Sequence, residues 1–302
     1  MNVLKPLLYF SLFRYPLTAK ELFDFSEVED LKQTEHLLKD LVDRGVVYQI
    51  DKFYLCENNP DWVARRLSGN QFAKDVQHKA LSVSKFISKF PYVEGVGISG
   101  SLSKGYFDKD SDIDFFIITK HNRLWIARTL LVLYKKIFLL NSRKHFCVNY
   151  FISESALEIE EKNRFTATEL ATLIPMVGNG SFHAFYKENP WVADILPNKS
   201  VGAGIDKMLP IKKPFGSRFV EQALNWRLGA WLDAFFLRLT YKRWKVKFET
   251  MEDRHFNVAM KSTKNISKHH PLNFQNSVIG RLNQKYAEIK KLHNISLSLE
   301  NV

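Results

Sequence analysis

Hydrophobic and polar positions follow a helical spacing over most of the first 45 residues. The spacing predicts one helix over residues 3–14 and another within residues 30–45. Between them, Thr18 and Glu21 have the spacing of a capping box, in which each side chain satisfies the other residue's backbone N–H at the start of a helix. Two short strands are expected on either side of a turn near Asp51.

Three helices and a hairpin in this order are similar to a winged helix-turn-helix unit, and we expect residues 1–60 to form such a winged-helix-like domain. The unit could contact DNA or could serve as a structural or protein-docking module. The stretch from Glu27 to Arg44 holds the candidate recognition helix and carries six acidic against three basic residues. Because an acidic helix is repelled by phosphates, the docking interpretation is favoured.

The pattern changes between residues 61 and 158. A helical region extends up to Phe90 and is followed by the strand "VEGVGIS" and a polar loop over residues 100–111. The second strand, "DIDFFIIT", comes next, then a helix over residues 124–140 and the third strand, "HFCVNYFIS". This order predicts a compact α/β core with a small mixed sheet.

Residues 159–302 are expected to form a helical domain. Helices are predicted in "ATELATLIPMVG", over residues 218–248, and in "RLNQKYAEIKKLHN". The long segment carries an aromatic stripe that consists of Trp226, Trp231, Phe235 and Trp244. We expect this stripe to be a packed helical core rather than a base-stacking surface. The predicted fold class is therefore α+β, with three units over residues 1–60, 61–158 and 159–302.

Charge is distributed unevenly along the 302 residues. The formal net charge is +12, and residues 201–302 contain 18 Lys and Arg against 8 Asp and Glu. This region could contact a polyanion. A basic run at the end of the long helix consists of Lys242, Arg243, Lys245 and Lys247. This run could be a phosphate-contacting patch or a solvated helix terminus.

The two cysteines, Cys56 and Cys147, lie far apart and lack metal-type spacing, so neither a disulfide framework nor a zinc site is expected. No apolar run is long enough for a membrane span, and no secretory leader is expected. The expected location is the reducing cytoplasm.

Candidate chemistry is concentrated in "GISGSLSKGYFDKDSDIDFFIIT", residues 97–119. Gly100 and Ser101 follow a strand, where a small-residue bend can cradle a phosphate. Asp112 and Asp114 are two apart at the entry of the next strand, so both carboxylates project to one face. Such a pair is neutralised well by Mg²⁺, which prefers oxygen ligands and keeps substrate phosphates in its shell.

Two other interpretations of this stretch fail. A calcium-binding EF-hand loop would need Gly at position 113 and Glu at position 119, where Ile113 and Thr119 stand. A Walker-type loop would need Gly-Lys-Ser/Thr before a helix, which is absent. Asp108 and Asp110 are expected to form a turn.

"GSLSKG" followed by "SDIDFFII" resembles the signature of the nucleotidyltransferase superfamily, which includes DNA polymerase beta, kanamycin nucleotidyltransferase and the minimal nucleotidyltransferases. The resemblance covers about residues 80 to 155. It implies that the bend binds the triphosphate of a nucleoside triphosphate, with ATP expected, and that the two strand acids bind Mg²⁺ or Mn²⁺. The residues concerned are Gly100, Ser101, Ser103 and Lys104 for the nucleotide, and Asp112 and Asp114 for the metal.

Members of this superfamily normally carry a third carboxylate on a following strand. In "CVNYFIS" the corresponding position is Asn149, and an amide cannot accept a proton as a general base. Glu154, just past that strand, is a candidate substitute. The implied function is transfer of a nucleoside monophosphate to an acceptor hydroxyl on a small molecule, an RNA or a protein. The alternative is a catalytically silent nucleotide- or nucleic-acid-binding regulatory protein.

Overall fold

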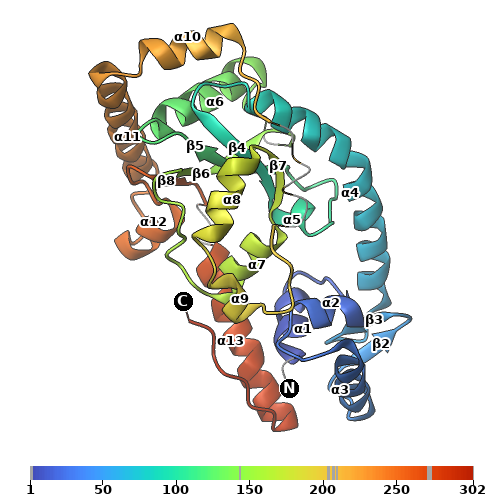
Figure 1. Ribbon diagram of the computed structural model, residues 1–302. Coiled ribbons are helices and arrows are strands. Elements are labelled where there is room, and N and C mark those ends of the chain that lie inside the picture. The colour runs from blue at the N-terminus through green and yellow to red at the C-terminus, as the bar shows by residue number, and fades with distance from the viewer. Residues whose placement is uncertain are drawn as a thin grey trace.

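The computed structural model describes residues 3–142, 144–202, 205, 208, 210–270 and 274–301. Figure 1 shows an elongated molecule with a small N-terminal unit at one end and a central sheet, covered by helices, toward the other. The long helix α4 (Pro60–Ile87) runs from the N-terminal unit along the side of the sheet region and so connects the two parts.

The N-terminal unit contains the three helices and the two strands that the sequence pattern predicts, and a further short strand, β1. In chain order these are α1 (Leu4–Ser11), β1 (Leu17–Thr18), α2 (Ala19–Asp24), α3 (Leu31–Asp43), β2 (Tyr48–Ile50) and β3 (Phe53–Leu55). The strands form a small sheet in the order β1-β3-β2. The capping box of Thr18 and Glu21 is confirmed, with both reciprocal hydrogen bonds present. The assignment of this unit to the winged-helix class stays a prediction.

The central sheet is mixed, as expected. Its order is β7-β4-β5-β6-β8, with β5 and β6 parallel and the other neighbours antiparallel. The strands are β4 (Val93–Ser99), β5 (Asp114–Thr119), β6 (Cys147–Ser153), β7 (Ile174–Val177) and β8 (Ile266–Lys268). One helical turn, α5 (Gly100–Ser103), follows β4, and α6 (Leu124–Phe138) makes the crossover from β5 to β6.

The region after residue 158 is less purely helical than expected. Its helices are α7 (Arg164–Thr172), α8 (Asn179–Lys187), α9 (Val192–Ile195), α10 (Phe215–Ala223), α11 (Arg227–Lys247), α12 (Asp253–Ala259) and α13 (Phe274–His293). It also supplies both edge strands, β7 and β8, of the central sheet. The prediction of one continuous helical segment in residues 167–178 is wrong, because α7 ends at Thr172 and Ile174 pairs with Ile98 of β4. The proposed domain boundaries stay predictions.

Helices cover both faces of the sheet, and the alternation of side chains along β5 shows it. Phe115 and Ile117 point into a core shared with α6, whereas Phe116 and Ile118 point into a second core that includes residues of α7 and α8. Successive strand residues project to opposite faces, so a strand covered on both sides has to be apolar at every position. The sequence "FFII" meets that requirement.

The predicted helix over residues 218–248 is broken between α10 and α11. The buried side chain of Arg123 binds the carbonyls at the break, donating from Nε to Leu224 O (3.1 Å) and from Nη2 to Asn225 O (2.8 Å). Those carbonyls are thereby satisfied outside a helix.

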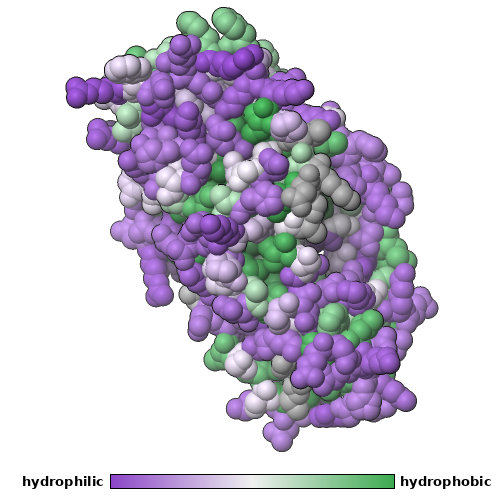
Figure 2. Space-filling model, viewed as in Figure 1, coloured by the Kyte–Doolittle hydropathy of each residue, from purple (hydrophilic) through white to green (hydrophobic). Residues whose placement is uncertain are grey.

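The expectation that the aromatic stripe forms a packed core is wrong for three of its four members. Trp226 is 81% exposed, Trp231 60% and Phe235 44%, whereas Trp244 is buried. The residues of α11 that pack against the core are instead Leu232, Phe236 and Leu237. Figure 2 shows a mostly hydrophilic face that hydrophobic residues interrupt in small groups. No described helix is long and apolar enough to cross a membrane.

Candidate active site

The glycine bend and the strand acid lie next to each other at one end of the central sheet. Ser99, the last residue of β4, is paired with Asp114, the first residue of β5. Gly100 follows with a φ of 69°, a conformation that favours glycine, and a Cβ at this position would collide with Asp114 Oδ2. The bend therefore requires glycine both for its backbone conformation and for the space that the Asp114 carboxylate occupies.

Two further residues hold the bend. Ser103 Oγ donates a hydrogen bond to Gly100 O (2.8 Å), and Lys104 Nζ donates to the same carbonyl (3.0 Å). Lys104 Nζ also forms an ion pair with Glu169 Oε1 of α7 (2.7 Å). The side chains expected to contact a nucleotide thus surround the bend, with the Lys104 charge engaged by a carboxylate.

Asn149 reaches Asp114 because of an irregularity in the parallel pairing of β5 and β6. The register runs from Phe115 opposite Val148 to Phe116 opposite Tyr150, so Asn149 is an extra residue in β6. Such a bulge redirects a side chain. Asn149 Nδ2 donates to Asp114 Oδ1 (3.1 Å), and the structure therefore places an amide where the resemblance implies a third carboxylate.

Glu154 does not substitute for that carboxylate. Its Oε1 accepts a hydrogen bond from the backbone N–H of His121 (3.1 Å), and its own backbone N–H donates to Thr119 O at the far end of β5. Asp114 and Thr119 are the opposite ends of the same strand. The interpretation of Glu154 as a site residue is therefore wrong.

Burial raises the pKa of the Asp114 carboxyl to about 6. The negative charges of Asp112 and Glu169 raise this pKa further, while a hydrogen bond with Cys147 and the positive charge of Lys104 oppose the shift. Asp112 is half-buried and forms no hydrogen bond or ion pair with any described residue. The two aspartates influence each other electrostatically, but Asp112 lies before the start of β5 and does not line the neighbouring cavity. The expectation that both carboxylates project from one strand face is therefore wrong, and their joint role in metal binding stays a prediction.

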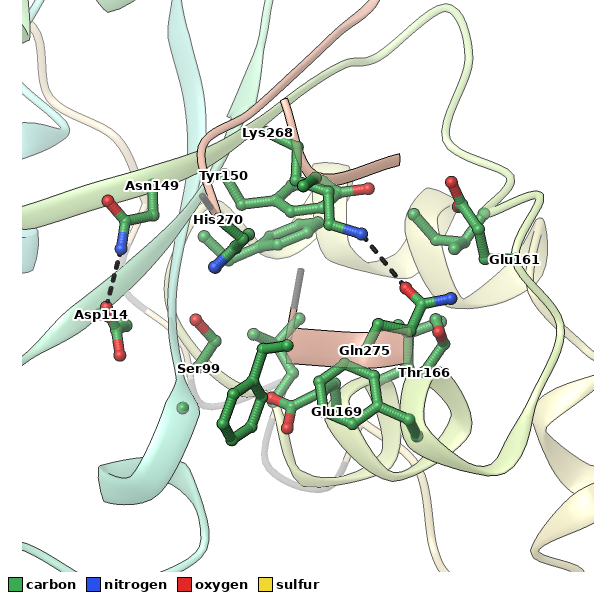
Figure 3. A pocket seen from close by; sticks show the side chains of 18 of the residues that line it. Ser99, Asp114, Asn149, Tyr150, Glu161, Thr166, Glu169, Lys268, His270 and Gln275 are labelled. Atoms are coloured by element: carbon green, nitrogen blue, oxygen red, sulfur yellow. Dashed lines mark hydrogen bonds between the residues drawn. The ribbon is translucent and has the colours of Figure 1, made fainter. Parts of the chain in front are cut away.

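A cavity of about 350 Å³ opens at Asp114, and Figure 3 shows its lining. Apart from the bend and the Asp114–Asn149 pair, its walls are mainly apolar and aromatic, with Phe116, Tyr150, Ile159, Phe165, Leu170, Leu173 and Phe274. The size and the apolar walls are typical of small-molecule sites.

The far end of this cavity carries a second polar group of residues. Lys268 of β8 lies directly opposite Tyr150 of β6 and donates from Nζ to Gln275 Oε1 (3.1 Å). Burial lowers the pKa of the Lys268 ammonium. The buried hydroxyl of Thr166 finds no partner among the described residues. In Figure 3 the Asp114–Asn149 pair and the Lys268–Gln275 pair occupy different ends of the cavity.

The sequence analysis missed Lys268, Gln275, Thr166 and Glu169. They reach the cavity from β8, α13 and α7, which are separated from the motif by more than 40 residues. No local pattern marks them, because their roles arise only when distant segments pair.

A second cavity, of about 360 Å³, lies on the other side of the bend and shares Gly100, Ser101, Glu169 and Phe274 with the first. Its other lining residues include Phe10, Phe13, Tyr15, Arg65, Lys104, Tyr106, Asp108 and Ser111. Asp108 accepts hydrogen bonds from the Ser111 hydroxyl and the Tyr106 hydroxyl, both at 2.7 Å, and so helps to build the loop, as expected.

Within the described part of the chain, no three His, Cys, Asp or Glu side chains are grouped so that they could hold a metal ion. The residues near the bend offer two aspartate carboxylates, a chemically suitable but incomplete donor set for a hard cation.

The chain was compared with protein families, with curated proteins and with solved structures. No curated protein and no solved structure matches it. Residues 82–168 match the family model described as a nucleotidyltransferase domain, which confirms for this core segment the resemblance to the nucleotidyltransferase superfamily.

Proposed function

We propose that this protein transfers a nucleoside monophosphate from a nucleoside triphosphate, with ATP expected, to an acceptor hydroxyl, and that the reaction depends on Mg²⁺ or Mn²⁺. One observation carries the proposal: within the matched domain, the left-handed bend at Gly100 lies directly against the Asp114 carboxylate, where a Cβ on residue 100 would collide with Asp114 Oδ2. In this proposal the bend is the phosphate cradle and Asp114 is a metal-binding acid, and the two are adjacent.

In this proposal Gly100, Ser101 and Ser103 hold the triphosphate at the bend. The ammonium of Lys104 leaves its ion pair with Glu169 and binds a phosphate oxygen instead. Asp112 and Asp114 would hold the divalent cation through their oxygens, the donor type that such a cation prefers. The cation would supply charge stabilisation at the entering and leaving oxygens.

The acceptor oxygen attacks the α-phosphorus in line, the bond from that phosphorus to the bridging oxygen breaks, and pyrophosphate leaves. Asn149 has no basic lone pair, so in this proposal the proton of the attacking hydroxyl passes to solvent water and not to residue 149. Instead, the Asn149 amide orients the Asp114 carboxylate through the hydrogen bond to Oδ1.

The test is incubation of the purified protein with α-labelled nucleoside triphosphates and Mg²⁺ or Mn²⁺, in the presence of RNA, protein and small-molecule acceptors. Transfer of label should be lost in Asp112→Ala and in Asp114→Ala. Asp110→Ala is the matched control, because Asp110 is an exposed acid of the same loop and should be dispensable. Equal loss in all three variants, or label transfer that persists in Asp114→Ala, contradicts the proposal.

A second function is favoured by one observation, the amide at position 149. In that reading the protein binds a nucleotide or nucleic acid without turnover and acts as a regulatory protein. Wild type would then bind a nucleoside triphosphate but transfer no label, and Asn149→Asp would gain metal-dependent transfer.

We further propose that residues 1–60 act as a winged-helix-like docking module and that the protein works in the cytoplasm. The acidic balance between Glu27 and Arg44 supports docking to a protein rather than to DNA. The free thiols of Cys56 and Cys147 suit a reducing compartment.

A further inference from the structure

A third cavity, of about 390 Å³, is lined by residues of α6, α11 and the beginning of β6. Its lining contains five cationic side chains and no aspartate or glutamate among the described residues, and the five are Arg128, Lys135, Lys136, Arg243 and Lys247. Such a concentration of one charge around a concave surface raises the local concentration of anions.

Arg128 is held against aromatic rings rather than by an acid. Its guanidinium lies 4.7 Å from the ring centre of Trp244 and 5.5 Å from that of Trp125. No described carboxylate forms an ion pair with it, and burial lowers its pKa to about 10. The Arg128 side chain is half-buried, and a cation that is partly withdrawn from water without a counter-ion is costly; an anion entering the cavity relieves that cost.

The basic run at the end of α11 is divided by the fold. Arg243 and Lys247 line the cavity, and neither forms an ion pair with a described carboxylate. Lys245, by contrast, pairs with Asp253 (2.5 Å), and Lys242 is exposed and does not line the cavity. The two cations that face the cavity are thus the ones left available to a ligand.

Asn149 connects this cavity to the candidate active site. It lines the cationic cavity and also the cavity that opens at Asp114. A ligand held by the cations of α6 and α11 therefore lies beside the residue that contacts the Asp114 carboxylate.

We propose that the cationic cavity binds phosphate groups of the acceptor, so that the acceptor is a phosphorylated molecule whose hydroxyl reaches the Asp114–Asn149 end. This inference rests on the proposed nucleotidyl transfer. Phosphate is the expected anion because several cations converge there and because the guanidinium of Arg243 or Arg128 matches a phosphate with paired N–H donors. A monocarboxylate would leave most of that charge uncompensated.

The experiment measures binding of inorganic tripolyphosphate to the full chain by calorimetry, in EDTA and at about 150 mM salt, which screens exposed charges beyond about 8 Å. EDTA removes the metal on which nucleotide binding at the bend is proposed to depend. The test variant combines Arg243→Gln with Lys247→Gln. The matched control combines Arg238→Gln with Lys242→Gln, which removes the same charges from exposed positions of the same helix outside the cavity.

Tripolyphosphate should bind wild type and the control variant with affinities within about twofold, and the test variant at least about tenfold more weakly, because each lost charge-assisted hydrogen bond weakens binding substantially. Equal weakening in both variants, or no saturable binding to wild type, overturns the inference. A second arm adds a short single-stranded RNA with a free 3′ hydroxyl. Competition with tripolyphosphate identifies a nucleic-acid end as the source of the phosphates, and absence of competition identifies a small phosphorylated alcohol.

The outcome is separable from that of the label-transfer assay, because this binding is measured without metal or nucleotide. Selective loss of binding in the test variant, together with no label transfer by wild type, would remove the proposed reaction and leave the phosphate site standing.

Discussion

Replacement of Asn149 by Asp is the sharpest test of the geometry at the candidate site. The substitution changes few atoms, but it turns a hydrogen bond from Asn149 Nδ2 to Asp114 Oδ1 (3.1 Å) into a contact between two carboxylates. Two full charges about 4 Å apart repel by about 4 kcal/mol at an effective dielectric constant of about 20.

The Asn149→Asp variant can avoid most of that repulsion by keeping a proton on the Asp114 carboxyl. The pKa of this carboxyl is already about 6, and pH 7.5 lies about 1.5 pH units above that value. Since one pH unit corresponds to about 1.4 kcal/mol, holding the proton at pH 7.5 costs about 2 kcal/mol. The cost of about 2 kcal/mol for keeping the proton is smaller than the repulsion of about 4 kcal/mol. We therefore expect Asn149→Asp to destabilise the folded protein by about 2 kcal/mol at pH 7.5. At pH 5.5 Asp114 is largely protonated, and the cost should nearly vanish.

The assay is denaturant unfolding of wild type and Asn149→Asp in EDTA at pH 7.5 and pH 5.5, repeated at pH 7.5 with millimolar Mg²⁺. We expect a loss of about 2 kcal/mol in the free energy of unfolding at pH 7.5 and recovery of most of it with Mg²⁺, which neutralises clustered carboxylates. Asn179→Asp is the control, because it makes the same chemical change at an exposed position at the start of α8. If Asn149→Asp matches this control at both pH values, residue 149 does not face Asp114 and the reasoning is refuted.

Three further predictions follow from the same contacts. Gly100→Ala should lower the free energy of unfolding by about 1–3 kcal/mol, because φ is 69° and the new methyl group meets Asp114 Oδ2; a denaturation curve unchanged from wild type contradicts this. Asp114→Asn should stabilise the metal-free protein by about 3 kcal/mol at pH 7.5, because folding raises the pKa of this carboxyl from 3.8 to about 6 and one pKa unit corresponds to about 1.4 kcal/mol. The gain should be constant above about pH 6 and fade as the pH falls toward 4; a gain that grows in acid would be inconsistent. Arg66→Met should cost about 2–3 kcal/mol, because it removes the buried guanidinium that pairs with Glu21 (2.6 Å) and leaves this carboxylate without its counter-charge, although its hydrogen bonds from Thr18 remain. Arg65→Met, at the exposed neighbouring position, is the control for the same unfolding measurement.

Local patterns were sufficient to predict the motif and its immediate supports. The bend at Gly100 and the strand after the acidic loop depend on sequence neighbours and on the period of a strand, although β5 begins at Asp114 and not at Asp112 as the pattern predicts. The capping box at Thr18 likewise depends on two residues three positions apart. Interactions of this range leave a visible signature in one sequence. The contact of Asn149 with Asp114 depends instead on the irregular pairing of β5 and β6, which the strand period does not show.

The remaining parts of the site depend on contacts that no local pattern encodes. Lys268 belongs to a three-residue strand whose identity follows from its pairing with Tyr150, more than 100 residues earlier. The break between α10 and α11 is stabilised by Arg123, about 100 residues earlier in the chain, which binds the carbonyls of Leu224 and Asn225. Helical periodicity identified α11 as amphipathic but could not show which face meets α6.

The amide of Asn149 affects two cavities, because this residue lines both the cavity at Asp114 and the cationic cavity. A carboxylate at this position would help to hold a divalent cation beside Asp114, but it would also place a negative charge in the lining of the cationic cavity. A neutral side chain avoids repelling a phosphate there and still orients Asp114 through its N–H group. The amide in place of the expected third acid therefore lowers the affinity for a metal ion and raises the affinity for the proposed phosphorylated acceptor. We expect Asn149→Asp to bind Mg²⁺ more tightly and tripolyphosphate more weakly than wild type.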